Sequence, residues 1–191
     1  MAIETVITQE MIAEYTSKGY WTNLTYRDRF LENVRKYPEK IAMVAREGRI
    51  TYRELDQASS SLALNFLELG LTKEDVVGIQ LPNSIEFAVV VFSLVKIGSV
   101  IVAFPSLFRA KEADYILRLT DAPAFIIPRK IKDFDYYRMV EEIHPNLPQL
   151  KHVIISGDDR KGTGQGVPFG LSGRDRTGCR RRISNRGDRR D

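Results

Sequence analysis

Arg109 is the residue whose position in this chain most suggests a role in binding a substrate. A cation at the start of a predicted helix gains nothing from the helix dipole, which favours cations at the opposite end. The alternative is an exposed arginine that forms an ion pair with Glu112 or Asp114, a frequent arrangement on protein surfaces. We therefore take Arg109 as the candidate substrate-binding residue and keep the surface ion pair as the alternative.

The other residues of reactive type lack the neighbours that catalysis or metal binding requires. His144 and His152 have no cysteine or acidic cluster at metal-ligand spacing. The serines at 59–61 lie in a predicted helix, without a base or a nucleophile turn nearby. Asp133 and Asp135 stand beside lysines and indicate a solvated turn. The sequence therefore predicts no catalytic residue and no metal site.

The elements that must position Arg109 alternate between helical and extended patterns. Strands that alternate with helices of this length predict parallel β-α-β units, so the expected fold class is α/β with a mainly parallel sheet flanked by helices. The apolar periodicity predicts helices over residues 8–18, 26–37, 52–69, 84–97, 111–119 and 136–143, and strands over residues 41–45, 76–81, 100–104, 124–127 and 152–155.

Local signals fix several helix ends. Thr25 opens one predicted helix, and Thr51 with Glu54 has the spacing of a capping box. Gly70 and Gly98 are placed to close two others. A further expectation concerns residues 20–21, Tyr-Trp, which we expect to fasten the N-terminal helix to the body of the protein.

Charge and composition change abruptly near residue 160. Residues 160–191 contain ten Lys or Arg against three Asp, which leaves residues 1–159 mildly acidic although the whole chain carries a net charge of +4. We expect two parts: residues 1–159, a partial domain, and residues 160–191, a basic Gly/Arg-rich tail too poor in apolar residues to fold. The tail is either out-of-frame translation or a genuine segment that binds nucleic acid or a partner, with Arg180–Arg182 as its densest charge.

Several classes of protein are disfavoured by the same composition. The single cysteine, Cys179, gives no disulfide framework and no thiolate metal cluster. The most apolar stretch, residues 85–104, is interrupted by Glu86 and Lys96 and is too short between them to span a membrane. Residues 1–19 do not resemble a secretory signal. We expect a cytoplasmic protein with no membrane span, for which nucleic acid is not the main partner.

Three segments resemble the opening motifs of one enzyme superfamily. They are residues 50–56 (Ile-Thr-Tyr-Arg-Glu-Leu-Asp), 81–87 (Leu-Pro-Asn-Ser-Ile-Glu-Phe) and 94–100 (Leu-Val-Lys-Ile-Gly-Ser-Val). Their order and spacing resemble the N-terminal part of the adenylate-forming acid–CoA ligases, the acyl-CoA synthetase superfamily. The resemblance extends over residues 15–158 and implies that this chain is a truncated N-terminal portion of the large domain of such a ligase.

Later residues resemble one branch of the superfamily. Residues 105–112, Pro-Ser-Leu-Phe-Arg-Ala-Lys-Glu, are similar to a Pro-x-x-Phe-Arg-x-x-Glu stretch of cyclohexanecarboxylate–CoA ligase-like and medium-chain acyl-CoA synthetases. The aryl-acid–AMP ligases of siderophore synthesis are the alternative, but they carry Ser-His-Arg where this chain has Leu107-Phe108-Arg109. In a full-length relative, Arg109 would lie near the entrance for the acyl group or coenzyme A.

The resemblance implies an activity that needs more than this chain. Such ligases join a carboxylic acid to ATP as an acyl-adenylate and then transfer the acyl group to coenzyme A, with Mg²⁺ at the phosphates. The phosphate loop of the family lies downstream of the matched region, and residues 162–169 lack its threonines and lysine. We expect this chain alone to be inactive and to bind none of these cofactors tightly. A non-catalytic binding protein that uses the basic tail is the other alternative.

Overall fold

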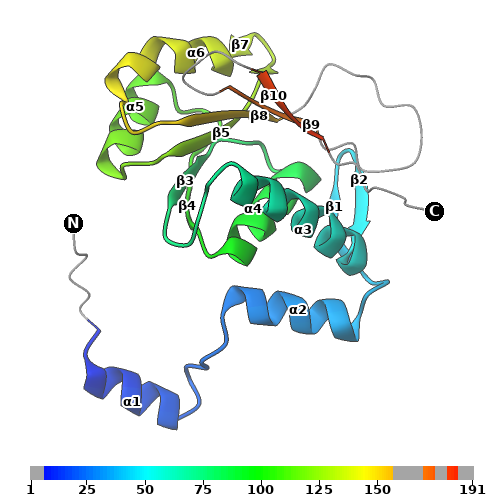
Figure 1. The fold of residues 1–191 in the computed structure, drawn as a ribbon. Coiled ribbons are helices and arrows are strands. Elements are labelled where there is room, and N and C mark those ends of the chain that lie inside the picture. The colour runs from blue at the N-terminus through cyan, green and yellow to red at the C-terminus, as the bar shows by residue number, and fades with distance from the viewer. Residues whose placement is uncertain (1–6, 157–169, 175–179, 185–191) are drawn as a thin grey trace.

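The computed structural model describes residues 7–156, 170–174 and 180–184 (Figure 1). The elements in chain order are α1 (Gln9–Ser17), α2 (Tyr26–Lys36), β1 (Ile41–Ala45), β2 (Gly48–Thr51), α3 (Tyr52–Glu68), β3 (Val76–Ile79), α4 (Ile85–Ile97), β4 (Val100–Ala103), α5 (Ala110–Leu119), β5 (Ala124–Pro128), β6 (Lys130–Ile131), β7 (Phe134–Asp135), α6 (Tyr136–Ile143), the 3-10 helix η1 (His144–Asn146), β8 (His152–Ser156), β9 (Gly170–Arg174) and β10 (Arg180–Ser184).

A six-stranded sheet with the order β10-β9-β8-β5-β3-β4 forms the centre of the molecule. The four strands β8, β5, β3 and β4 are parallel to one another, whereas β9 and β10 are antiparallel to their neighbours. The predicted α/β class and the mainly parallel sheet are therefore confirmed.

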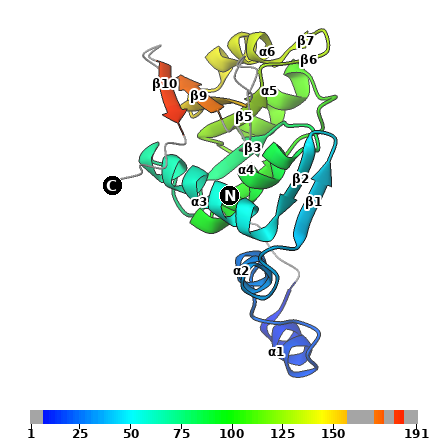
Figure 2. The same cartoon turned by 90° about the vertical axis from the view of Figure 1, so that its right-hand side faces the viewer.

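The alternating side chains of the sheet enter two separate cores. Along β5, Ala124 and Ile126 belong to the core that α3 and α4 cover, whereas Phe125 and Ile127 belong to the core that α5 and α6 cover. All five residues of this strand are buried. Figure 2, which turns the molecule by a quarter, shows the two helical layers on opposite sides of the sheet. Parallel strands need this cover on both faces because neither face can be left in water.

The helix ends form where the local signals predict them. Thr25 and Thr51 each begin a helix with a complete capping box. Ser84 caps α4, and Gly98 ends it in the left-handed conformation with φ of 80°. Because each cap satisfies backbone groups within one turn, the sequence alone is sufficient to place it.

The structure contains two short hairpins that were not predicted from the sequence. Strand β2 pairs antiparallel with β1, and its Ile50 is completely buried against the α3–α4 core. Strands β6 and β7 pair over only two residues each, where the sequence predicts a loop. Strands of two to four residues show too little alternation to be recognised, and the pairing partner decides whether they form.

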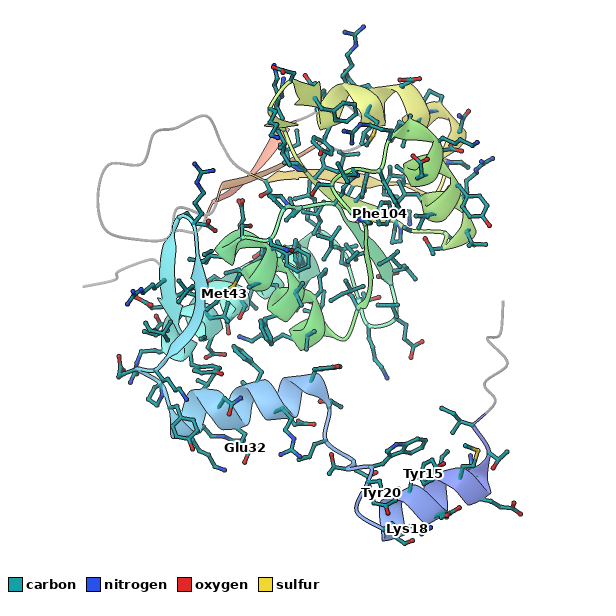
Figure 3. The ribbon with its side chains drawn as sticks, turned by 180° about the vertical axis from the view of Figure 1, so that it is seen from behind. Tyr15, Lys18, Tyr20, Glu32, Met43 and Phe104 are labelled. Carbon is teal, nitrogen blue, oxygen red and sulfur yellow. The ribbon has the colours of Figure 1, made fainter. Side chains whose placement is uncertain are left out.

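The expected anchoring of the N-terminal helix to the body by Tyr20 and Trp21 is wrong. Both rings contact Tyr15 of α1 itself, with ring centroids 6.3 Å and 5.0 Å apart. Tyr20 is 72% exposed, no residue of α1 is buried, and the helix stands away from the sheet (Figure 3). The aromatic residues therefore fold the chain back on its own helix.

The predicted tail is described only in part. Strands β9 and β10 lie inside residues 160–191, for which the sequence predicts disorder, and they extend the sheet beyond β8. The remaining tail residues, including Cys179, lie outside the described residues. The boundary at residue 159 and the tail as a binding segment stay predictions.

No helix within the described ranges is long and apolar enough to cross a bilayer.

Gly78 of β3 allows close packing of the aromatic residues above it. A Cβ atom at this position would lie 2.9 Å from Phe125 Cδ2 and 3.0 Å from Leu117 Cδ2. Phe125 has no room to retreat, because it is completely buried and its ring packs against Phe104 at 5.1 Å. The absent side chain of Gly78 therefore determines how closely α5 and the two rings approach the sheet.

We predict that Gly78→Ala destabilises the protein by about 1–3 kcal/mol, because the added methyl group overpacks a core without space. The free energy of unfolding, measured by urea denaturation, tests this. Ala103→Val, which adds two methyl groups at an exposed position of β4, is the control and should change the free energy by less than about 0.5 kcal/mol. Equal stability of Gly78→Ala and the unaltered chain would contradict the packing argument.

Lys96 joins α4 to α3 through a half-buried polar cluster. Its Nζ donates to the Asp56 carboxylate at 2.7 Å, to the Asp56 carbonyl at 2.8 Å and to Ser60 Oγ at 2.7 Å. The Lys96 side chain is only 12% exposed. The amine also lies 5.4 Å from the centre of the Phe30 ring of α2.

We predict that Lys96→Met costs about 2 kcal/mol of stability, because hydrogen bonds to a charged group are lost and the carboxylate of Asp56 keeps no cation. Lys73→Met is the matched control, since Lys73 pairs with Glu74 at 3.6 Å and both side chains are mostly exposed. The control should lose less than about 0.5 kcal/mol. Similar losses in the two variants would show that the cluster adds nothing beyond a surface pair.

Candidate functional site

The carboxyl ends of the parallel strands meet at one edge of the sheet, and the connections turn in opposite directions there. From β3 the chain passes through α4 to β4, and from β4 it crosses back through α5 to β5 on the other side of β3. The connections that leave β3 and β5 therefore run in opposite directions, and the switch point lies between these two strands. In open α/β sheets, ligands bind outside the carboxyl ends of the strands at such a switch point.

The segment from Phe104 to Arg109, here called the β4–α5 loop, lies at this edge. Its first residue is fixed to β3, because the Phe104 N–H donates to the Ile79 carbonyl at 2.7 Å. The Phe104 ring is 96% buried in the core beneath α5 and α6, where Figure 3 labels it. The loop thus begins from a rigid position on the sheet.

Buried side chains from two other elements hold the rest of the loop. Gln80, the residue after β3, is completely buried, and its Nε2 donates to the carbonyls of Pro105 at 3.0 Å and Phe108 at 2.9 Å. Tyr136, the first residue of α6, donates from its hydroxyl to the Ser106 carbonyl at 2.6 Å. Three carbonyl groups of the loop thereby accept hydrogen bonds from side chains of other elements, and the Pro105 carbonyl also accepts from the Phe108 N–H at 3.0 Å.

Arg109 ends the loop with its guanidinium group held in one orientation. Its Nη1 donates to the carbonyls of Ser106 at 3.0 Å and Phe108 at 2.9 Å. The guanidinium carbon lies 4.0 Å from the centre of the Phe134 ring, a cation–π contact. The residue itself is exposed. A guanidinium fixed at Nη1 and at one face still offers its Nε and Nη2 hydrogens to a planar anion.

The alternative expectation of a surface ion pair is wrong for the Arg109 side chain. The Glu112 carboxylate accepts instead from the backbone N–H of Arg109, at 2.9 Å, and so caps α5. Asp114 pairs with Arg118 on the next turn of the same helix. These two acidic groups are already engaged, and Arg109 takes carbonyl groups and an aromatic ring as its neighbours.

This helix cap lowers the pKa of the Glu112 carboxyl group. The hydrogen bond from the Arg109 N–H stabilises the charged form of Glu112, and its own backbone N–H adds to the effect, so the pKa of this carboxyl is lowered from its ordinary value of 4.5. Desolvation would raise this pKa, but its effect is smaller because Glu112 is exposed.

The other reactive residues lie on other elements. His152 lies at the amino end of β8, the opposite edge of the sheet, and Ser59 is buried within α3, where it donates to the Leu55 carbonyl. Asp135 caps α6 by accepting from the Arg138 N–H at 3.0 Å. Among the described residues, no group of three or more His, Cys, Asp or Glu could hold a metal ion. Residues 162–169, the one glycine-rich candidate for phosphates, lie outside that part of the chain.

The sequence reasoning missed the residues that hold the loop. Gln80 gave only a weak signal in the sequence. It is a polar residue directly after a buried strand, and such a residue lies at the carboxyl end of the strand with its side chain toward the interior. Phe134 and Tyr136 gave none, because their contacts with a loop some thirty residues away depend on the tertiary fold. Arg129, which follows β5 and stacks 5.0 Å from the Tyr137 ring, is a second guanidinium at this edge.

Comparison with known proteins agrees with the resemblance of the motifs. A family model described as AMP-binding enzyme matches residues 30–175. The chain belongs to this family. The matched range runs past residue 159, where the sequence analysis placed the end of the domain.

Individual relatives come from more than one branch. The chain is 35% identical over 150 residues to a 2,3-dihydroxybenzoate-AMP ligase of Bacillus subtilis, a match that covers 78% of this chain and 28% of the relative. It is 30% identical to a medium-chain fatty-acid–CoA ligase of Escherichia coli, covering 81% of this chain and 27% of the relative. The structure of apo MbtA from Mycobacterium smegmatis superposes with a TM-score of 0.73 at 27% identity, covering 85% of this chain and 32% of that one. This chain therefore spans about a third or less of these proteins.

The lowered pKa of Glu112 predicts a measurable effect of acid on the loop. A carboxyl group whose pKa is lower in the folded state stabilises the fold at pH values above the pKa that the group has in the unfolded chain. This stabilisation is lost as the pH falls through the pKa that the group has in the folded state. We predict that Glu112 titrates below 4.5 when its side-chain carbon signal is followed by NMR, and that the Arg109 amide signal shifts in the same step. Glu112→Gln should remove that step from the amide. A midpoint at or above the ordinary value would contradict the cap.

Proposed function

We propose that this chain is the N-terminal portion of an ATP-dependent ligase that activates a carboxylic acid as an acyl-adenylate. The observation that carries the proposal is the family match over residues 30–175, supported by relatives that include both an aryl-acid–AMP ligase and an acyl-CoA ligase. In the reaction, a carboxylate oxygen attacks the α-phosphorus of ATP and pyrophosphate leaves. A thiol then attacks the acyl carbon and releases AMP.

The acid is proposed to be aromatic, alicyclic or of medium chain length. Coenzyme A is the thiol acceptor that the Leu107-Phe108-Arg109 sequence favours, and the E. coli relative is a CoA ligase. The 35% identity to a 2,3-dihydroxybenzoate-AMP ligase favours an aryl acid equally well. An aryl-acid–AMP ligase of siderophore synthesis is therefore the second candidate.

Arg109 is proposed to contact the anionic part of the substrate. Its guanidinium lies at the carboxyl edge of the parallel sheet, and its Nε and Nη2 edge matches the two oxygens of a carboxylate. Preorganisation by Phe134 and two carbonyl groups lowers the entropy that is lost on binding. The ring of an aromatic acid would then extend over Leu107, whose side chain is 82% exposed.

ATP and Mg²⁺ need further residues. ATP would supply the adenylyl group, and Mg²⁺ would neutralise charge on the phosphates. The family places the residues that bind them beyond the motifs matched here. Because this chain covers only 28% and 27% of two relatives, we propose that it catalyses neither half-reaction alone.

The decisive experiment is a chimera in which residues 30–156 of this chain replace the matching segment of the B. subtilis ligase. We expect the chimera to catalyse ATP–pyrophosphate exchange that depends on added acid. Arg109→Ala in the chimera should raise the KM for the acid about tenfold, as expected when a charged hydrogen bond is lost. The acids to be compared are 2,3-dihydroxybenzoate, benzoate, cyclohexanecarboxylate and octanoate.

Two controls make the result interpretable. The chain alone should give no exchange above a vector control. Arg53→Ala, which removes an exposed partner of Glu39 in the first turn of α3, should leave the KM unchanged. A folded chimera without acid-dependent exchange for any of the four acids would refute the proposed function. Exchange by the chain alone would refute its proposed inactivity.

A further inference from the structure

Gln80 differs from the buried serines of α3 and α4 in what it contacts. The hydroxyls of Ser59 and Ser93, also completely buried, donate to carbonyl groups one turn earlier in their own helices. Gln80 instead reaches from the end of β3 to two carbonyl groups of the β4–α5 loop, 25 and 28 residues later in the sequence. Its backbone N–H donates to the Ile126 carbonyl of β5, so the residue is fixed at the switch point itself.

One carbonyl group connects Gln80 to Arg109. The Phe108 oxygen accepts from Gln80 Nε2 at 2.9 Å and from Arg109 Nη1 at 2.9 Å. The direction of this carbonyl therefore links the position of the guanidinium to the Gln80 amide. Arg109 has a second carbonyl partner in Ser106, which the Tyr136 hydroxyl holds in turn.

The orientation of the Gln80 amide follows from its neighbours. Both Nε2 hydrogens are used by carbonyl oxygens, and a flipped amide would place Oε1 against the same two acceptors. The orientation shown leaves Oε1 buried and without a hydrogen-bond partner among the described residues. An unsatisfied buried acceptor destabilises a protein, and an apolar side chain of similar length would avoid this cost. Packing alone therefore does not explain a glutamine here.

We propose that Gln80 is a positioning residue that fixes the Arg109 guanidinium through the shared Phe108 carbonyl. Its two amide hydrogens lock the loop in the conformation in which Arg109 is exposed and its Nη1 donates to the Ser106 and Phe108 carbonyls. This role rests on the proposed function only in that Arg109 is the group that receives the substrate anion. The locking itself is a property of the chain without any ligand.

The test compares three variants of the full chain. Gln80→Met keeps the length of the side chain but has no donor, Gln80→Glu replaces the amide by a carboxyl group, and Gln149→Met is the matched control. Gln149 also donates from Nε2 to a carbonyl group in the same half of the molecule, that of Leu117 at 3.0 Å, but it does not touch the loop. Hydrogen exchange of backbone amides and the NMR signal of the Arg109 Nε–H are measured in each.

For Gln80→Met we expect the Phe108 and Arg109 amides to exchange about tenfold faster, with exchange at Ile79 and Ile126 changed less than about twofold. The Arg109 Nε–H signal should move toward the position of a freely rotating arginine. Gln149→Met should leave the loop amides and the Arg109 signal unchanged. Loop exchange and an Arg109 signal in Gln80→Met equal to those of the unaltered chain would overturn the proposal.

Gln80→Glu allows a measurement that distinguishes a hydrogen-bonding role of this side chain from a space-filling role. In Gln80→Glu the ionised group would face two carbonyl oxygens, whereas the protonated group can donate to one of them. After correction for intrinsic rates, loop exchange should be fast near about pH 8 and return toward that of the unaltered chain near about pH 5. Loop exchange in this variant that does not depend on pH would overturn the proposal, even if Gln80→Met fails to fold.

Failure of this proposal and failure of the proposed function are distinguishable. The loop measurements need no substrate and concern only Gln80, Phe108 and Arg109. A chimera without acid-dependent exchange would refute the function and leave the loop measurements to decide the role of Gln80.

Discussion

The burial of both faces of strand β5 is the constraint on which the rest of this structure depends. Every residue of Ala124–Pro128 is buried, and the strand has parallel neighbours on each side. A parallel strand needs a helical crossover to reach its neighbour, so helices must cover both faces. The right-handed sense of these crossovers then separates α4 from α5 and α6. Because the four strands are parallel, their carboxyl ends meet at one edge of the sheet.

The loop at that edge combines two requirements that conflict in most loops. It lies close against the sheet, to which the Phe104 N–H is hydrogen-bonded, yet its carbonyl groups cannot be buried without donors. Gln80 and Tyr136 resolve the conflict by supplying donors from rigid elements. The Arg109 guanidinium is therefore exposed, yet one face packs on the Phe134 ring and its Nη1 is hydrogen-bonded. It is held by rigid parts of the fold rather than by a mobile surface loop.

Membership of the AMP-binding enzyme family gives this scaffold a chemical context. The relatives named above include an aryl-acid–AMP ligase and a fatty-acid–CoA ligase, and the chain matches both kinds at similar identity. The part of the fold described here is therefore common to both branches. The two matches therefore do not distinguish an aryl-acid–AMP ligase from a fatty-acid–CoA ligase.

The sequence alone determined the helices, the parallel strands and the family, because these depend on short-range signals. Caps such as Thr51 and Gly98 satisfy backbone groups within one turn, and strand-length apolar runs indicate burial wherever they pack. Only the tertiary structure decided the strand order, the short hairpins and the neighbours of Arg109. The alternative prediction for Arg109 was an ion pair with Glu112 or Asp114, yet its guanidinium binds carbonyl groups and Phe134. Those contacts join segments far apart along the chain, and no local pattern specifies which distant groups the fold will bring together.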